Sequence, residues 1–208
     1  MSLYRIIPHV SRTFFGEWMG WPNIYNRGAD IAFEDEAGIG IMTRSGRTWG
    51  EVNSPPTISA SDQRGGYNVF SAITRKGDLY YRIEEQSVGS EEYIGFLQQI
   101  LDEHPRPIVL IVDHASFHSS KKVRDFVRAH RHQLRVFFFP KHAPHVNPDE
   151  QVWNDIKNRK LGRQSIFNKE HLKMRILSAF MKLESCVPTI ISFFHLKDTS
   201  YIMEPQAS

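Results

Sequence analysis

The stretch that most constrains the fold is an unbroken apolar run, Ile108–Val112, which ends in the carboxylate of Asp113. Pro105 and Pro107 stand before the run. β-Branched and aliphatic residues without alternation are typical of a strand that is buried on both faces of a parallel sheet. A carboxylate directly after such a strand lies at the carboxyl edge of the sheet, where open α/β sheets place their functional sites. Asp113 is therefore the first candidate functional residue.

Length and composition indicate a globular protein. A chain of 208 residues is long enough for one sizeable domain or for a domain with an appendage. The hydrophobic content of 40% and the aromatic content of 12% argue against disorder. No apolar run approaches the roughly eighteen residues of a membrane span, and no secretory signal pattern opens the sequence. Cys186 is the single cysteine, which excludes an internal disulfide and favours a reducing compartment.

Charge is distributed unevenly along the chain. Residues 1–112 hold 10 Lys and Arg against 14 Asp and Glu, whereas residues 113–208 hold 16 against 9. A basic half that also contains carboxylates suggests a polyanionic partner with metal ions between the two. Ordinary surface charge explains the same balance, so this observation only supports the others.

Hydrophobic periodicity predicts the order of the elements. Strands are expected over residues 29–36, 67–74, 79–84, 108–112 and 136–139, with a turn at Gly38 and Gly40 after the first. Helices are expected from a cap at Ser90, over 119–130, from a cap at Asn147 and over 169–183. Less regular predictions are a short helix within 14–26, an extended piece at Thr48-Trp49 and a loop over 53–66. Three antiparallel-looking strands followed by helix, strand, helix, strand and helix form the ribonuclease-H-like arrangement, an α/β fold with a mixed five-stranded sheet flanked by helices.

The first predicted strand supplies a second candidate carboxylate. Because strand side chains alternate between the two faces, Ile31, Phe33 and Asp35 share one face. This alternation alone distinguishes Asp35 from its acidic neighbours Asp30, Glu34 and Glu36.

The helix after the last strand supplies the third candidate. Asn147 suits an N-cap, Pro148 suits the first helical position and Glu150 falls at the third, as in a capping box. Glu150 could serve only as a capping partner, and Asp113 could serve only as a cap for the segment after it. A charged group that ends a buried strand nevertheless favours a functional role.

Three carboxylates at one sheet edge predict a site for divalent metal ions. Like charges a few ångström apart raise one another's pKa, and divalent cations offset this repulsion. Mg²⁺ and Mn²⁺ prefer oxygen ligands, and two such ions can activate a water molecule and stabilise the leaving oxygen of a phosphodiester. The expected reaction is cleavage that leaves a 3′-hydroxyl, which the same site can then use as a nucleophile on a second strand.

Several basic and polar side chains near these carboxylates are candidates for contacts with DNA. Four histidines crowd the region, but no cysteine is near and their spacing matches no zinc motif, so phosphate contact or plain hydrogen bonding is the favoured interpretation: His114, His118, His142 and His145. Lys157 lies two helical turns after Glu150 and shares its face. The predicted DNA contacts are His118, Lys141, Asn154 and Lys157. The basic helix over 121–131 is expected to be a solvated face.

At this point the residues resemble a known family. The segments DHASFH and FFFPKHAPHVNPDEQVWNDIK resemble the signatures of the DDE transposases, most closely the insertion-sequence six-thirty group, relatives of the mariner elements. FEDEAGI resembles the first-strand motif of the family, and the likeness extends from about Trp18 to Ile202. His114 replaces the asparagine that is usual after the second aspartate. The resemblance implies a catalytic triad of Asp35, Asp113 and Glu150 that also binds two Mg²⁺ or Mn²⁺ ions.

The resemblance further implies double-stranded DNA as partner, both as transposon ends and as target, a homodimer on the DNA, and a bacterial cytoplasmic, nucleoid-associated location. About thirty residues precede Asp35, which is too few for the helix-turn-helix modules of such transposases, so we expect these to be missing or supplied separately. The expected organisation is a linker or remnant over 1–28, the catalytic domain over 29–165 and a C-terminal helical extension over 166–208. Two alternatives stay open: a catalytically idle remnant that binds DNA, and a ribonuclease-H-fold nuclease without transposition activity.

Overall fold

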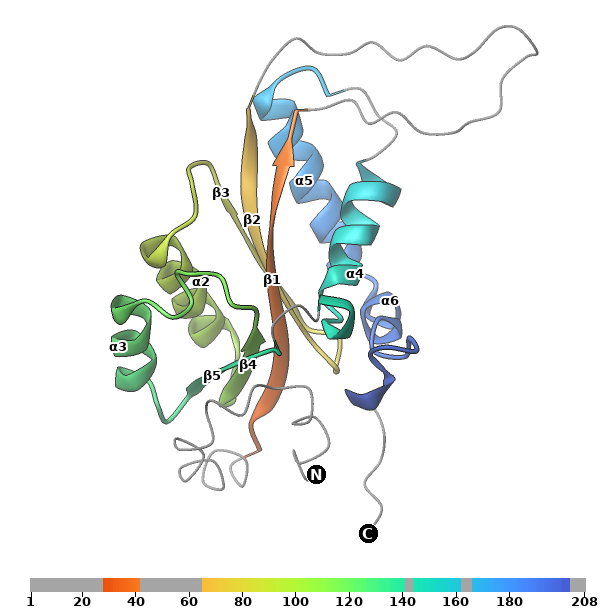
Figure 1. The fold of residues 1–208 in the computed structure, drawn as a ribbon. Coiled ribbons are helices and arrows are strands. Elements are labelled where there is room, and N and C mark those ends of the chain that lie inside the picture. Colours follow the sequence, from red (N-terminus) through yellow and green to blue (C-terminus); the bar gives the residue numbers. More distant parts are fainter. Residues whose placement is uncertain (1–27, 42–64, 141–143, 162–165, 203–208) are drawn as a thin grey trace, which may run out of the picture.

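The computed structural model describes residues 28–41, 65–140, 144–161 and 166–202 (Figure 1). Five strands form one sheet in the order β3-β2-β1-β4-β5. Their bounds are β1 (Asp30–Gly40), β2 (Gly66–Thr74), β3 (Leu79–Glu84), β4 (Ile108–Val112) and β5 (Leu134–Phe138). The pairs β1–β2 and β2–β3 are antiparallel, whereas β1–β4 and β4–β5 are parallel. The predicted mixed five-stranded sheet is therefore confirmed.

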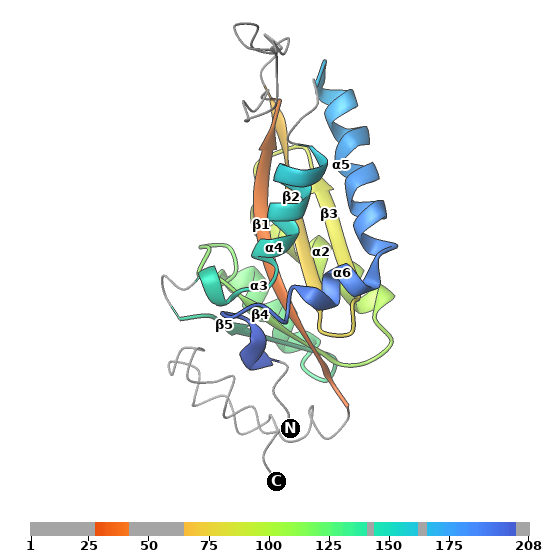
Figure 2. The same ribbon diagram turned by 90° about the vertical axis from the view of Figure 1, so that its right-hand side faces the viewer.

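Helices cover both faces of this sheet (Figures 1 and 2). One face carries α2 (Ser90–Glu103) and α3 (Lys121–Ala129). The other face carries α4 (Glu150–Trp153), its π-helical continuation η6 (Asn154–Lys160), α5 (Lys169–Glu184) and α6 (Val187–Ser192). Two short 3-10 turns, η5 (Pro144–Val146) and η7 (Ser200–Ile202), complete the described elements. The sheet thus separates two hydrophobic cores, as expected of a ribonuclease-H-like α/β fold.

The central strands β1 and β4 contribute side chains to both cores. On β1, Ala32 joins the core under α2 and α3, while Phe33 joins the core under α4 and α5. All five residues of β4 are buried, as the unbroken apolar run predicted. Because each strand alternates, the position of every polar residue on β1 fixes which helical layer its side chain faces.

Strand β1 is longer than predicted, because it continues through Gly38 and Gly40 instead of turning there. Gly40 pairs with Gly66 of β2, and Ile39 beside it is buried. A Cβ atom on Gly66 would lie 2.5 Å from the carbonyl oxygen of Ile39. Glycine at this position therefore permits the close approach of two paired strands, and the turn prediction was wrong.

The predicted cap of α2 was also displaced by one residue. Gly89 is the N-cap, and its backbone N–H donates to the Glu92 carboxylate at 2.9 Å. The Ser90 hydroxyl instead donates to the Ser120 hydroxyl at 2.8 Å, which links the starts of α2 and α3. The predicted helix is present, and α2 buries Tyr93, Phe96, Leu97 and Ile100.

The C-terminal segment packs into the same core as the sheet. Phe194 and Ile202 are buried, and the ring of Phe194 lies edge-on to Phe33 of β1 with 5.8 Å between centroids. The predicted short helix within 14–26, the extended Thr48-Trp49 piece and most of the 53–66 loop lie outside the described residues. Within the described ranges, no helix is long and apolar enough to cross a membrane.

Candidate active site

Asp35 lies near the middle of β1 on the face that α4 covers. It stands between Phe33 and Ala37, which belong to the core on that face. One carboxylate oxygen, Oδ1, accepts the backbone N–H of Glu36 at 2.9 Å. Burial raises the pKa of Asp35 to about 8, and the negative charge of Glu150 raises it further in the same direction. A carboxylate in the middle of a central strand is thus held beside a second one from α4.

Asp113 directly follows β4 at the carboxyl edge of the sheet, as predicted. Its side chain is about half exposed, at 52%. Oδ1 accepts the backbone N–H of Ala115 at 2.7 Å and lies 3.1 Å from Nδ1 of His118. The hydrogen bond from His118 holds the pKa of Asp113 below its usual range, so this carboxylate is ionised at neutral pH. Asp113 is therefore an oriented anion that remains accessible from outside.

Glu150 is the first residue of α4 and is half-buried. Burial raises the pKa of Glu150, the positive charge of Lys157 lowers it, and the negative charge of Asp113 raises it. The charges of Asp35 and Glu150 also interact, so Glu150 links the other two carboxylates. A different group of side chains forms a tighter cluster in the described part of the chain. One ligand atom from each of Glu34, Glu36 and His118 lies within 4.8 Å of the other two.

The approach to α4 is fixed to the sheet by two buried side chains. The Asn147 side-chain amide donates to the carbonyl oxygen of Glu34 at 3.0 Å, and its Oδ1 accepts the backbone N–H of Asp149 at 3.0 Å. The Ser71 hydroxyl of β2 donates to Oδ1 of Asp149 at 2.9 Å. These bonds place Glu150 beside Asp35.

The predicted capping box was therefore wrong in detail. The α-helix begins at Glu150, not at Pro148, and its N-cap is Asp149. Asn147 uses its side chain to join β1 to the turn before the helix, so it is occupied by a tertiary contact. This leaves the Glu150 carboxylate outside the predicted capping role.

Replacing Asn147 with alanine is expected to lower the free energy of unfolding by about 2–3 kcal/mol, because it leaves a buried carbonyl and a buried N–H without their partners. Urea denaturation measures the change. Asn158→Ala is the matched control, since this asparagine is exposed on η6 and its loss is expected to cost less than about 0.5 kcal/mol. Equal effects of the two substitutions would contradict the proposed link between Asn147 and β1.

Sequence reasoning missed Asp149, which lies beside Asp35 inside the fold. Asp149 is fully buried, and one of its oxygens, Oδ2, has no hydrogen-bond partner. Burial, followed by the charge of Asp35, holds the pKa of Asp149 well above its usual range. The signal available in the sequence was a second acid directly before Glu150, but only the tertiary contact with Ser71 distinguishes it from a surface residue.

The structure places the predicted DNA contacts in different environments. His118 is buried between Asp113 and Glu34, which favours a role inside the protein over contact with DNA. Asn154 is exposed at the start of η6 and donates to Oε1 of Gln151 at 3.2 Å. Lys157 is partly exposed, and its ammonium lies 5.5 Å from the centre of the Trp153 ring. Lys141 lies outside the described residues.

The other histidines of this region also differ from one another. His114 lies at the surface with Nε2 2.7 Å from the carbonyl oxygen of Phe139, and its ring stacks on Phe138. His145 is exposed in η5, and His142 lies outside the described residues. The hydrogen bond that sequence reasoning allowed for this group is thus present at His114.

Comparisons with known proteins identify the family and the fold of the chain. Residues 30–173 match the family described as DDE superfamily endonuclease. The fold is similar to that of the Mos1 mariner paired end complex with Mn, at a TM-score of 0.60 and 15% identity over 83% of this chain and 55% of that chain. The Mos1 Strand Transfer Complex gives a TM-score of 0.55 and 16% identity over 78% of this chain and 54% of that chain.

The isolated Mos1 transposase catalytic domain, solved with Raltegravir and Mn, gives a TM-score of 0.54 and 12% identity over 86% of this chain and 85% of that chain. The present chain thus spans about half the length of the Mos1 chains in the two DNA complexes and most of the catalytic domain. A search of curated proteins found no match. Because the family match spans more than half of the sequence, the chain belongs to the DDE superfamily endonucleases.

Proposed function

We propose that this domain is the catalytic part of a metal-dependent DNA transposase, which hydrolyses a phosphodiester to a 3′-hydroxyl and then joins that end to target DNA. The observation that carries the proposal is that, in a DDE endonuclease domain, the charge of Glu150 interacts with that of Asp35 and the charge of Asp113 interacts with that of Glu150. Asp35 comes from β1, Asp113 follows β4 and Glu150 begins α4, and their charges interact through Glu150. Fold likeness to the Mos1 catalytic domain supports the same proposal.

The donor set fits divalent cations of the Mg²⁺ and Mn²⁺ class. The three side chains offer only oxygen ligands, which both ions prefer. Burial and mutual repulsion raise the pKa of Asp35 and Glu150, and a nearby cation would offset that repulsion. We propose that Asp35, Asp113 and Glu150 hold two such ions. Bound there, the ions would supply Lewis-acid activation of water and of the leaving oxygen.

The residues around the triad orient it and attract the substrate. Ala115 and His118 fix the direction of the Asp113 carboxylate through hydrogen bonds from a backbone N–H and an imidazole. Lys157 brings a positive charge close enough to Glu150 to lower the pKa of that carboxyl. We propose that Lys157 also binds a phosphate of the DNA. Asn154 and Lys141 are proposed as further contacts to the DNA backbone. His118 is proposed to position Asp113 rather than to touch DNA.

We propose double-stranded DNA, as transposon ends and as target, for the partner of this domain. Mos1 was solved as a paired-end complex and as a strand transfer complex, which supports a homodimer on DNA. Recognition of specific end sequences is proposed to come from helix-turn-helix modules separate from the described domain. We also propose a bacterial cytoplasmic location close to the nucleoid, where such a substrate is present.

Lys157→Ala is expected to reduce the salt dependence of DNA binding. Each phosphate contact that is lost lowers the slope of log K against log salt concentration by about 0.9 on duplex DNA. Fluorescence anisotropy with a labelled duplex at several salt concentrations measures the slope. Lys121→Ala is the matched control, because this exposed lysine lies on α3 at the opposite face of the sheet. A slope that falls equally in both variants would contradict the assignment of Lys157.

The proposed function is tested by nicking of supercoiled plasmid in Mg²⁺ or Mn²⁺, because the specific end sequence is not needed for this reaction. The expected result is metal-dependent conversion of the plasmid to open circles. A DNA polymerase should extend the nicked ends, because such extension requires a free 3′-hydroxyl. Folded protein that binds DNA without nicking it would replace the proposal with the idle remnant. Cleavage restricted to RNA–DNA hybrids would replace it with a nuclease that does not transpose.

A further inference from the structure

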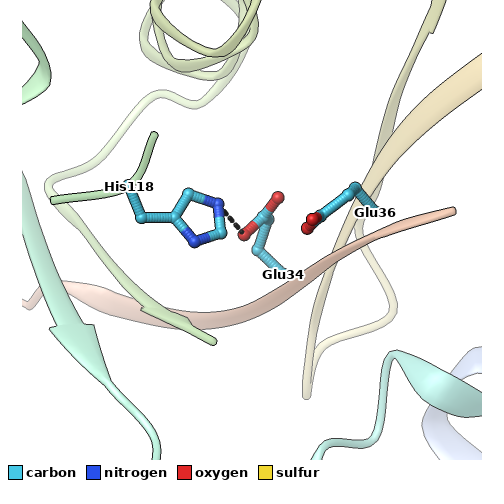
Figure 3. Close-up of side chains that lie close together, drawn as sticks. All are labelled: Glu34, Glu36 and His118. Carbon is cyan, nitrogen blue, oxygen red and sulfur yellow. Dashed lines mark ion pairs between the residues drawn. The ribbon is translucent and has the colours of Figure 1, made fainter. Parts of the chain in front are cut away.

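The face of β1 opposite Asp35 carries a second cluster of possible metal ligands. Glu34 and Glu36 alternate with Asp35 along the strand and therefore point toward the layer of α2 and α3. His118, from the segment between β4 and α3, approaches them from that layer (Figure 3). One ligand atom from each of the three side chains lies within 4.8 Å of the others. Nε2 of His118 lies 3.3 Å from Oε2 of Glu34.

Several polar atoms of this cluster are buried and lack a hydrogen bond. The side chains of Glu34 and His118 are 0% exposed. Oε1 of Glu34 and Oε2 of Glu36 have no hydrogen-bond partner, whereas Oε2 of Glu34 and Nε2 of His118 face each other as an ion pair at 3.3 Å. The hydroxyl of Tyr93, whose ring packs on His118 at 4.5 Å between centroids, is also buried without a hydrogen-bond partner. Buried polar atoms almost always have a hydrogen-bond partner or a bound ion, so a group of unpartnered atoms indicates a ligand that binds there.

His118 is oriented as histidine ligands of metals usually are. Its Nδ1 lies 3.1 Å from Oδ1 of Asp113 and 3.2 Å from the carbonyl oxygen of the same residue. An imidazole that donates its Nδ1–H to a carboxylate presents the lone pair of Nε2 to a cation on its other side. That other side faces Glu34 in this structure (Figure 3).

We propose that Glu34, Glu36 and His118 form a second divalent-cation site, distinct from the triad of Asp35, Asp113 and Glu150. The charge balance supports this, because one divalent ion neutralises two carboxylates beside a neutral imidazole. The mixed nitrogen and oxygen ligands favour Zn²⁺ or a similar transition ion over Mg²⁺, which prefers oxygen alone. An ion about 2.0–2.2 Å from each ligand would draw the three side chains slightly together. Glu36 is partly exposed and gives the ion a path of entry.

Such a site would join β1 to the segment that follows β4. The ion would fix Nε2 of His118, and Nδ1 of the same ring would then hold Asp113 in one orientation. The site therefore acts through position and makes no contact with the reacting phosphate. The alternative is that protons, not a metal ion, neutralise this cluster. In that case His118 is an imidazolium bound to Glu34, and Glu36 carries a protonated carboxyl.

The test is isothermal titration calorimetry with Zn²⁺ on the double variant Asp35→Asn with Glu150→Gln. This background removes two ligands of the triad and leaves the second cluster unchanged. The expected result is one ion per chain, with affinity at least about tenfold weaker after either Glu36→Gln or His118→Asn. His132→Asn is the matched control, because it removes an exposed histidine and is expected to leave the affinity unchanged.

Two outcomes would overturn the site. One is no zinc binding by the folded double variant, which would show that protons, and not a metal ion, neutralise the cluster. The other is binding that neither Glu36→Gln nor His118→Asn weakens, which would mark an adventitious surface ion. Circular dichroism of each variant shows that it is folded. Zinc binding is measured independently of DNA cleavage. A negative zinc titration therefore does not bear on the proposed catalytic triad, and a negative cleavage assay does not bear on the zinc site.

Discussion

Asp35→Asn is expected to lower metal-dependent nicking of supercoiled plasmid DNA by at least about 10³-fold, equivalent to roughly 4 kcal/mol of transition-state stabilisation. The amide keeps the size of the side chain but removes the charge that holds a cation on the α4 face of β1. Initial rates of open-circle formation, with parent and variant at equal concentration, measure the loss. Substrate binding is expected to change little, since Asp35 lies among carboxylates that repel DNA.

Asp125→Asn is the matched control for this experiment. Asp125 is an exposed acid on α3, where it pairs with Lys121 and Arg128, and α3 lies on the face of the sheet opposite α4. Its substitution is expected to leave the nicking rate within twofold of the parent. Nicking that survives Asp35→Asn at the rate of the control would show that the cleavage comes from another site or from a contaminating nuclease.

The two elements that carry chemistry most directly were readable from the sequence because their local patterns have a single structural solution. An unbroken run of five residues such as Ile108–Val112, after two prolines, is typical of a strand covered on both sides, and a charge directly after such a strand lies at the sheet edge. The strict alternation of Ile31, Phe33 and Asp35 likewise fixed one face of β1, and Phe33 indeed lies in the core on that face. Local pattern thus determined both the sheet and the place of two carboxylates within it.

The contacts that complete the site were not readable, because they join residues far apart in the chain. The Ser71 hydroxyl meets Asp149 across 78 residues, and the Asn147 amide meets the Glu34 carbonyl across 113. The local pattern suited Asn147 to an N-cap, and its Oδ1 does accept the Asp149 N–H. Its amide also makes a tertiary contact that the pattern could not show, with a buried carbonyl of the central strand. His118 shows the same limit: the sequence predicted a contact with DNA, whereas the fold buries this side chain between two acids.

In the absence of metal, Asp35→Asn is expected to stabilise the protein by about 3 kcal/mol at pH 8.5 and by much less at pH 4. The folded pKa of Asp35 is about 8, against an ordinary value of 3.8. A raised pKa means that the contribution of this group to stability is fully present below about pH 4 and is lost as pH rises to about 8. A shift of this size corresponds to roughly 6 kcal/mol, which we reduce because the side chain is partly exposed. Urea denaturation in EDTA at both pH values measures the difference.

The direction of this effect separates a catalytic carboxylate from a structural one. Neutralising a structural acid that is paired in the fold destabilises the protein. Neutralising Asp35 is expected to stabilise it, because burial and then the negative charge of Glu150 disfavour the ionised carboxylate. Mg²⁺ is therefore expected to raise the free energy of unfolding of the parent at pH 8.5 and to raise that of Asp35→Asn much less. A variant that is less stable than the parent at every pH would contradict this, since it would show that Asp35 is compensated within the fold. Instability of the metal-free site is the cost of keeping charge where a cation has to bind.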